Sequence, residues 1–459
     1  MNKKTRKKAL LTEGKESSVL IRMSIPMAIG ILSLFFFNLA DTYFVAKLGS
    51  KPLTALGFCL PLTLFLMNIN LGIGTGATSI ISKLIGEEKQ ELCLKRTIAA
   101  SYLFLSVLCL AYVFTVLFFL KDIFYFLGAA EDTVVFIKAY LKPWLLGSIL
   151  LTLLMLTSAI LRATGDTKTP SMIMLCAGIG NACLNPLFIF GFYSIPAMGI
   201  KGAAYATVLS WGIAFIFALY LLQKKSGLLN FKSFKGATFF KDIKPVLKVG
   251  LPAALSNVLV PLSSSVLTWF LAKEGEVYVG AFGIANRLEP IALVVVIVLT
   301  ASIVPFVGQN WGAGEIKRIQ RGMLFSFKFV LIFEAVVALL MLISSPLICQ
   351  VFTTDLPLRE SLETYLYLVP ISFGLQGVAM LVTSFLNAFQ KPLLASLIII
   401  IRLLLFQVPL AFIGIKYMGA PGVFLGKSIA GLLSGLVALL FYHFVIKEKL
   451  LEQNKSNQS

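Results

Sequence analysis

The stretch FFFNLADTYFV, residues 35–45, places an aspartate inside an apolar run that continues on both sides. A charged carboxylate at that depth in a bilayer costs roughly 2.5 to 3.5 kcal/mol on insertion scales. A buried carboxylate therefore takes up a proton or lies beside a cation. Asp41 is thus the first candidate for a functional residue, because a group that alternates between these states couples ions to a conformational change. The alternative is an aspartate that caps the outer end of a helix near Lys47.

The composition of the whole chain is that of a membrane protein. Of its 459 residues, 58% are hydrophobic and only 13% are charged, and the mean hydropathy is +0.90. Soluble proteins carry about 25% charged residues, and about 20 apolar residues cross a bilayer as a helix. Runs of that length recur throughout, so we expect an all-α polytopic membrane protein. The twelve expected spans are 21–46, 53–82, 97–120, 133–160, 171–193, 199–222, 246–271, 279–306, 322–349, 361–387, 393–415 and 420–446.

The net charge of +19 is unevenly distributed between loops. Basic residues crowd the N-terminal tail, the 83–96 loop, the 223–248 connector and the segment 317–321, whereas the alternate loops carry few. By the positive-inside rule, both termini are expected in the cytoplasm. Loop topology explains the basic excess more simply than nucleic-acid binding does, so no nucleic-acid partner is expected. The six cysteines show no metal-ligand spacing, and no structural metal is expected.

The chain repeats itself with a nearly constant register. Pro26 matches Pro252 at an offset of 226 (252 − 26), and further pairs follow in or near the same register: Gly57 with Gly283, Gly86 with Gly312, Tyr140 with Tyr365, and MGIKG at 198 with MGAPG at 418. Two halves of six spans each insert in the same orientation, which is the parallel-repeat arrangement of several secondary transporters. The expected domains are a basic cytoplasmic tail (1–20), an N-terminal lobe (21–222), a cytoplasmic connector (223–245), a C-terminal lobe (246–446) and a cytoplasmic tail (447–459).

The stretches FNLADTYFVAKLG, LRATGDTKTP, GNACLNPLFIFG, GIKGAAYAT and PFVGQNWGAG resemble the multidrug and toxic compound extrusion (MATE) transporters, over essentially the whole chain. The resemblance implies two pseudo-symmetric six-helix bundles in a V shape. It also implies export of amphipathic, often cationic compounds in exchange for protons or sodium ions, with no other cofactor. A location in the cytoplasmic membrane of a bacterium follows from the same resemblance, and the protein is expected to act as a monomer in the lipid bilayer.

In the branch of the family that this chain resembles, the N-terminal lobe holds a cation or proton site. Carried over by motif, the site comprises Asp41, Asn181, Asn185, Thr207 and the backbone carbonyl of Ala203. The family motif usually has an aspartate where this chain has Asn185, so one carboxylate is lost and Asp41 is the only acid in the group. We therefore favour protons over sodium, although neutral oxygens also coordinate hard cations. Another branch uses a seventh-span glutamate, which LPAALSNVLVPLSSS (251–265) lacks.

The C-terminal half carries intramembrane charges of its own. Arg287 and Glu289 lie two positions apart, so they do not face each other along a helix and each is expected to pair with another span. Their role is open between a structural ion pair and a part in coupling or substrate binding. Glu334 is central in the ninth span without an obvious partner, and a contact with Arg402 or Arg287 is our guess.

The resemblance suggests Pro26 as a bending point of the first span, against the simpler possibility of a static kink. The side chains expected to line a substrate cavity are Phe36, Phe37, Asn38, Met155, Thr157 and Ser158. Aromatic rings and flexible methionines suit flat cations of variable shape. We therefore expect small amphipathic cations as substrates.

Three other functions remain as alternatives. A flippase for lipid-linked oligosaccharides or cell-wall precursors, from a related fold, would carry a strongly cationic cavity, whereas the cavity residues named above are neutral or acidic. A membrane-embedded enzyme is disfavoured, because the sequence has no HExxH, GxSxG or paired-aspartate motif and a single histidine. A channel fits two asymmetric halves less well than alternating access does.

Overall fold

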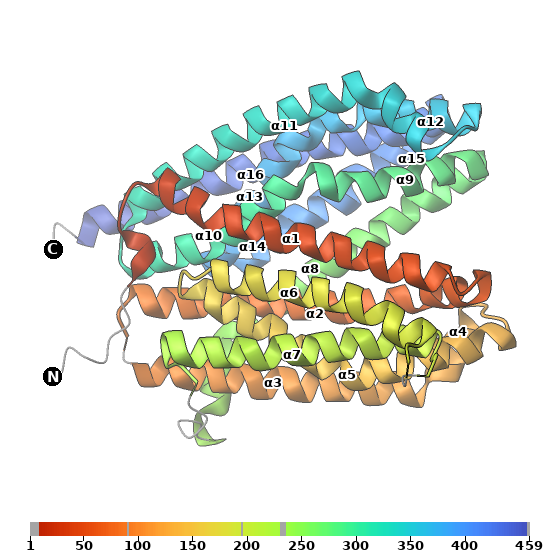
Figure 1. Ribbon diagram of the computed structural model, residues 1–459. Coiled ribbons are helices and arrows are strands. Elements are labelled where there is room, and N and C mark those ends of the chain that lie inside the picture. The colour runs from red at the N-terminus through yellow and green to blue at the C-terminus, as the bar shows by residue number, and fades with distance from the viewer. Residues whose placement is uncertain (1–8, 90, 194–195, 230–235, 457–459) are drawn as a thin grey trace. The chain divides into compact units, whose positions relative to one another are not determined.

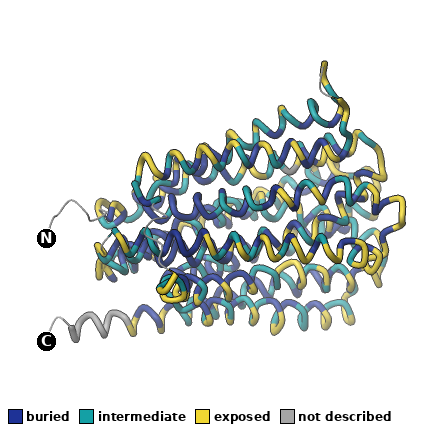
Figure 2. The backbone as a smooth tube through the Cα atoms, turned by 90° about the horizontal axis from the view of Figure 1, so that it is seen from below, coloured by how far each residue is buried: buried dark blue, intermediate teal, exposed yellow. Residues whose placement is uncertain are grey.

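The computed structural model describes residues 9–89, 91–193, 196–229 and 236–456, although not the side chains of 38 and 449–456. All the secondary-structure elements assigned in these ranges are helices. Twelve helical segments of the described residues are long and apolar enough to cross a membrane. The predicted all-α polytopic class is therefore confirmed. Large apolar side chains such as Phe114, Ile216 and Val351 are exposed, and Figure 2 shows exposed positions distributed along the helices. Lipid accounts for such exposure, since apolar surface on this scale is rare in soluble monomers.

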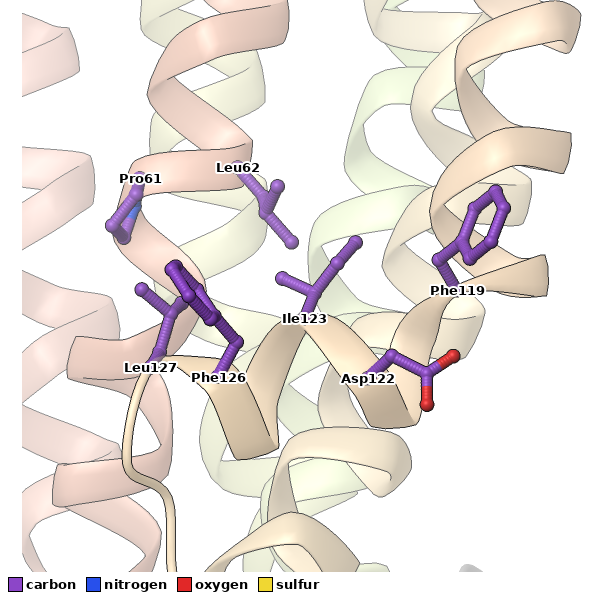
Figure 3. Close-up of a pocket in the computed structure, with 7 residues that line it drawn as sticks. All are labelled: Pro61, Leu62, Phe119, Asp122, Ile123, Phe126 and Leu127. Atoms are coloured by element: carbon purple, nitrogen blue, oxygen red, sulfur yellow. The ribbon is translucent and has the colours of Figure 1, made fainter.

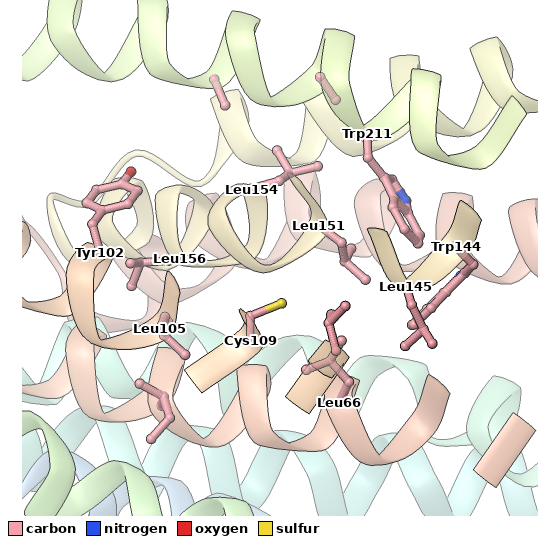
Figure 4. Close-up of a cluster of buried hydrophobic side chains, with 14 of the residues drawn as sticks. Leu66, Tyr102, Leu105, Cys109, Trp144, Leu145, Leu151, Leu154, Leu156 and Trp211 are labelled. Atoms are coloured by element: carbon pink, nitrogen blue, oxygen red, sulfur yellow. The ribbon is translucent and has the colours of Figure 1, made fainter. Parts of the chain in front are cut away.

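The chain divides into two compact units, which are residues 1–10 with 22–251 and residues 11–21 with 252–459. The first is built from α1 (Glu16–Ala46), α2 (Ser50–Gly86), α3 (Glu91–Phe118), α4 (Leu120–Phe126), α5 (Glu131–Ala163), α6 (Lys168–Phe190) and α7 (Ile200–Ser226). In this unit α5 is central, because it contacts α2, α3 and α7 along its length (Figure 1). Figure 4 shows the resulting core, in which Trp144 of α5 meets Trp211 of α7 edge to face at 5.6 Å between ring centroids.

The second unit contains several interrupted helices. It is built from most of α8 (Phe239–Glu274) with α9 (Glu276–Ala292), α10 (Val294–Gly312), α11 (Ile316–Phe352), α12 (Leu356–Leu368), α13 (Phe373–Ala388), α14 (Pro392–Ile400), α15 (Val408–Met418) and α16 (Ala420–Ser456). The eighth span, expected as one helix over 279–306, is in fact split at Leu293 after Pro290. The tenth is interrupted by a 3-10 turn at Pro370–Ser372, and the eleventh contains a π-helical segment, Ile401–Gln407. Proline and π-helical breaks are known causes of such interruptions.

The short helix α4 was not expected from the sequence. It contacts α5 and borders a hollow of about 480 Å³, which is lined by Pro61, Leu62, Phe119, Asp122, Ile123, Phe126 and Leu127. Figure 3 shows that the carboxylate of Asp122 points away from Pro61 and Leu62, so the wall of this hollow is apolar. An apolar hollow of this kind suits lipid contact and offers no polar groups for binding a specific ligand.

Ion pairs explain why the beginnings of two helices belong to these units. At the start of α8, Asp242 accepts two hydrogen bonds from Arg96 of α3, at 3.0 and 3.1 Å. At the start of α1, Glu16 accepts a hydrogen bond from Nε of Arg321 of α11 at 2.9 Å, and its Oε1 lies 3.6 Å from the guanidinium of Arg318. The start of α1 thus belongs to the second unit and the start of α8 to the first. The described parts of the expected cytoplasmic connector, 223–229 and 236–245, belong to the first unit, whereas residues 11–20 of the expected tail belong to the second.

The motif VGQNWGAG has a structural role in this arrangement. Gln309 accepts a hydrogen bond from the backbone N–H of Leu11 at 3.0 Å, and Asn310 donates one to the carbonyl of the same residue at 3.1 Å. Asn310 also accepts a bond from Arg318 at 3.0 Å. All of these groups are in the second unit, so the motif fixes the segment before α1 to the end of α10.

The motif GDTKTP orders the turn between α5 and α6. Asp166 accepts hydrogen bonds from the backbone N–H of Thr169 at 2.9 Å and from Lys225 at 2.8 Å. Burial acts to raise the pKa of Asp166, but the hydrogen bonds from Lys225 and Thr169 outweigh it and hold that pKa below its usual value. The carboxylate therefore stabilises the start of α6 in its ionised form.

Replacing Asp166 with Ala should lower the free energy of unfolding by about 1 kcal/mol at pH 7, the usual value for a lost helix cap. Because the folded-state pKa is depressed, this stabilisation is present above the unfolded value of about 3.9 and is lost as the pH falls through the lower folded value. Thermal unfolding of the detergent-solubilised protein at pH 7 and pH 3.5 measures the difference, with the exposed Asp122→Ala as control. A difference that grows as the pH falls would contradict this assignment.

Candidate ion-coupling site and intramembrane charge network

Asp41 is buried inside the first unit. It lies on α1 with 7% of its surface exposed, and its Oδ1 accepts a hydrogen bond of 3.3 Å from Nδ2 of Asn185 on α6. The carboxylate thus has a neutral partner, and the contact is longer than a typical N–H···O bond. The alternative of a solvated helix cap near Lys47 does not describe this environment.

The predicted polar residues form one continuous chain with Asp41. Asn185 donates to Oδ1 of Asn181 at 3.0 Å, and Asn181 donates to the hydroxyl of Thr207 on α7 at 3.1 Å. Asn181 and Asn185 are completely buried, as is Ala203, which precedes Thr207 by one turn. Three helices therefore bring the five predicted positions together, and four of their side chains are linked in series.

The hydrogen-bonded series from Asp41 to Thr207 has oxygen atoms that are free to accept a proton or a cation. Oδ1 of Asn185 is buried and has no hydrogen-bond partner among the described residues, and Asp41 has a second oxygen. A hard cation would need several oxygens at once, whereas a proton needs only the carboxylate. No group of three histidine, cysteine or acidic side chains that could hold a metal occurs in the described part of the chain.

Close packing of α1 on α6 allows the short side chains of the site to meet. A Cβ on Gly30 would lie 3.1 Å from Cα of Ser171, and a Cβ on Gly178 would lie 3.4 Å from the carbonyl of Ser33 and 3.9 Å from Cβ of Phe37. Small residues at these positions let the two backbones approach. Phe37 is consequently seated beside α6.

The predicted hinge and the predicted substrate-cavity residues of the first unit lie in different environments. Pro26 lies inside α1, which continues as a helix through it, so its role as a hinge stays a prediction. The side chain of Asn38 lies outside the described residues. Thr157 is fully buried and shares a 2.6 Å hydrogen bond with Tyr102 of α3, and Ser158 is also fully buried. In this conformation both residues belong to the packing of α5, whereas Met155 and Phe37 are only partly buried.

The second unit contains an ion pair that the sequence only half indicated. Glu289 of α9 accepts hydrogen bonds from Lys427 of α16 at 2.6 Å, from Tyr365 of α12 at 2.9 Å and from Gln376 of α13 at 3.1 Å. The side chains of Glu289 and Lys427 are only 14% and 10% exposed. Pairing of Glu289 with another span is confirmed, but its partner was missed. The signal was present, because Lys427 is the one charged residue in the apolar stretch 420–446.

The other charged residues of this unit do not pair as expected. Glu334 on α11 is 1% exposed, and neither of its carboxylate oxygens has a hydrogen-bond partner among the described residues. The guess that it contacts Arg402 or Arg287 is therefore wrong. Nε of Arg402 is buried and also has no hydrogen-bond partner in the described structure. Arg287 is exposed on α9.

Removing one member of the Glu289–Lys427 pair should destabilise the protein strongly. Glu289→Gln or Lys427→Met alone leaves a buried charge without its counterion, which costs about 3–5 kcal/mol. The double variant removes both charges and should recover much of that loss. Unfolding in detergent of the two single variants and the double variant measures this coupling. Strictly additive losses would show that the two side chains act independently.

Glu334→Gln should leave the free energy of unfolding unchanged or raise it slightly. An ionised carboxylate without a partner is expensive in this environment, whereas the amide has nearly the same shape and no charge. Thermal unfolding of the variant in detergent tests this expectation, with Glu289→Gln as the contrasting case. A large loss of stability would show that the ionised form of Glu334 has a partner in the native protein.

Known proteins resemble this chain over both halves. A MatE family profile matches residues 26–187 and again residues 252–413. The chain is 35% identical over 422 residues to an FAD transporter of Shewanella oneidensis, covering 91% of this chain and 92% of that protein. It is 27% identical over 437 residues to the multidrug export protein MepA of Staphylococcus aureus, with 94% of each covered.

Its fold is similar to that of the Vibrio cholerae MATE transporter VcmN in the bent form, with a TM-score of 0.90 and 29% identity over 95% of this chain and 98% of that one. The family profile covers more than half of the chain and begins its two matches at Pro26 and Pro252. These positions are the same pair that defines the internal repeat. The chain therefore belongs to the multidrug and toxic compound extrusion (MATE) family of multi-pass membrane transporters.

Proposed function

We propose that the chain is a secondary active antiporter in which Asp41 couples export of a small molecule to entry of a proton. The observation that supports this proposal best is the buried series Asp41–Asn185–Asn181–Thr207. A carboxylate with a neutral partner can bind a proton or release it when the surrounding helices move. Its protonation state then differs between the two conformations of alternating access, which links the ion to the cargo.

Sodium is the second coupling ion that this site fits. The unpartnered Oδ1 of Asn185 and the second oxygen of Asp41 are both suited to a hard cation. Replacement of the usual aspartate by Asn185 removes one negative charge, and this favours the proton.

The cargo proposed from the sequence is a small amphipathic cation, in keeping with the multidrug relatives. A second candidate is a flavin nucleotide, because the relative of 35% identity is named an FAD transporter. A flippase for a lipid-linked precursor remains the alternative from a related fold. We further propose that the protein works as a monomer in the cytoplasmic membrane of a bacterium, with both termini in the cytoplasm, as the basic loops indicate.

Transport by the purified protein in liposomes tests the coupling. Ethidium and FAD are offered separately, each with a pH gradient alone or a sodium gradient alone. We expect the pH gradient to drive transport, and Asp41→Asn to reduce it to the level of empty liposomes, because an amide cannot carry the proton. Asp132→Asn is the matched control, since this acid is exposed and paired with Lys51.

The other outcomes have distinct meanings. Transport driven by sodium and lost in Asp41→Asn would assign the same site to a cation. A variant that transports like the parent would remove Asp41 from the coupling mechanism. If no gradient drives either compound, the antiport proposal fails for both cargo classes.

A further inference from the structure

In the second unit, two bases of the membrane-spanning helices lie close enough to act on the single carboxylate of Glu289. Lys427 on α16 bonds Glu289 directly, and Arg402 in the π-helical segment interacts with the same carboxylate electrostatically. The single carboxylate of Glu289 thus interacts with two bases that are buried or half-buried. Glu334 has no hydrogen-bond partner among the described residues, so it contacts neither of these bases directly. Charged side chains at such depth are rare and commonly mark a substrate or ion pathway.

The guanidinium of Arg402 is available for a ligand. Its Nε is buried without a hydrogen-bond partner, and no hydrogen bond to the rest of the guanidinium occurs within the described residues. Glu289, its electrostatic counterpart, already accepts bonds from Lys427, Tyr365 and Gln376. An arginine kept only to neutralise Glu289 would be expected to bond it directly, as Lys427 does.

The local backbone gives a second, independent indication. Arg402 lies in a seven-residue π-helical segment, Ile401–Gln407, and π-helical turns inside α-helices occur frequently at functional sites. Gln407 in the same segment donates to the hydroxyl of Ser263 on α8 at 3.0 Å, and Asn286 on α9 donates to Ser264 at 3.3 Å. Hydrogen bonds therefore link polar side chains of the π-helical segment and of α9 to α8.

We propose that the second unit binds a phosphate-bearing anionic group of the exported molecule, with Arg402 as the direct ligand and Lys427 as a neighbouring positive charge. The planar guanidinium matches phosphate oxygens in a bidentate manner. This inference rests on the proposed export function and replaces its cationic cargo with an anionic one. A soluble nucleotide such as FAD supplies the required pyrophosphate together with a flat aromatic ring system.

Flavin fluorescence of FAD and riboflavin, titrated with the purified protein in detergent, tests the site directly. Riboflavin has the same ring system without phosphate. We expect Arg402→Gln to weaken FAD binding by about 10- to 100-fold, the usual range for one charged hydrogen-bonding group. Riboflavin binding should change little. Inorganic pyrophosphate should compete with FAD in the parent and much less in the variant.

Two further variants control for fold and charge. Lys416→Gln makes the same change of charge on an exposed residue of α15, so it should bind FAD like the parent. Arg402→Lys should bind FAD with an affinity between those of the parent and Arg402→Gln, because lysine keeps the positive charge but cannot bond phosphate in the bidentate manner of a guanidinium. Equal losses for FAD and riboflavin in Arg402→Gln would overturn the proposal, as would an unchanged affinity for FAD.

The same variants separate this inference from the antiport proposal. Asp41→Asn should keep FAD binding, because the site lies in the second unit, and lose gradient-driven transport. If FAD binding depends on Arg402 while no gradient drives any cargo, the anion site stands and antiport fails. If a pH gradient drives ethidium while FAD is neither bound nor moved, antiport stands and the anion site fails. If the protein binds only a lipid-linked pyrophosphate, the proposal of a soluble nucleotide as cargo is wrong, and the flippase alternative is favoured.

Discussion

The burial of the Asp41 carboxylate in a membrane-spanning unit is the constraint on which the candidate coupling site depends. A bilayer offers no water to satisfy a polar group, so partners must come from neighbouring helices. Asn185 can reach Asp41 only because α1 and α6 approach closely at Gly30 and Gly178. The small residues thus allow the helices to approach, and this approach places the amides beside the carboxylate. The proposed change in protonation state of Asp41 depends on both.

Much of this unit could be predicted from the sequence for simple physical reasons. Hydropathy locates the candidate spans because a helix needs about 20 mostly apolar residues to cross a bilayer. The four-residue spacing of Asn181 and Asn185 puts both amides on one helical face. The burial of Thr157 against Tyr102 was not predictable, because hydropathy does not tell which face of α5 meets α3. The same limit applies to the breaks at Leu293 and in Ile401–Gln407, which depend on tertiary packing.

Other features were present in the sequence but were not recognised. Glu16 and Asp242 are 226 residues apart (242 − 16), and their partners Arg96 and Arg321 are 225 apart (321 − 96), in the register of the repeat. Each acid lies at the start of the first span of its half and each base at the start of the third span of its half. Asp242 bonds Arg96 and Glu16 bonds Arg321, so each acid pairs with the base of the other half of the sequence. A repeat thus predicts paired ion contacts as well as paired helices. Lys427 is a solitary base in an apolar span, which indicates a buried partner but does not say which acid that partner is.

The two halves place different chemistry at corresponding positions. In the register that aligns Pro26 with Pro252, Asp41 corresponds to Leu267, which is completely buried. In the register that aligns MGIKG with MGAPG, Thr207 corresponds to Lys427. The second half therefore has an apolar residue in place of the acid of the coupling site, and a base in place of the hydroxyl. Without the carboxylate, these two positions offer no negative charge for a cation, whereas Lys427 carries a positive charge. Divergence after duplication thus agrees with the proposals made above, which assign coupling to one half and cargo binding to the other and require neither half to do both.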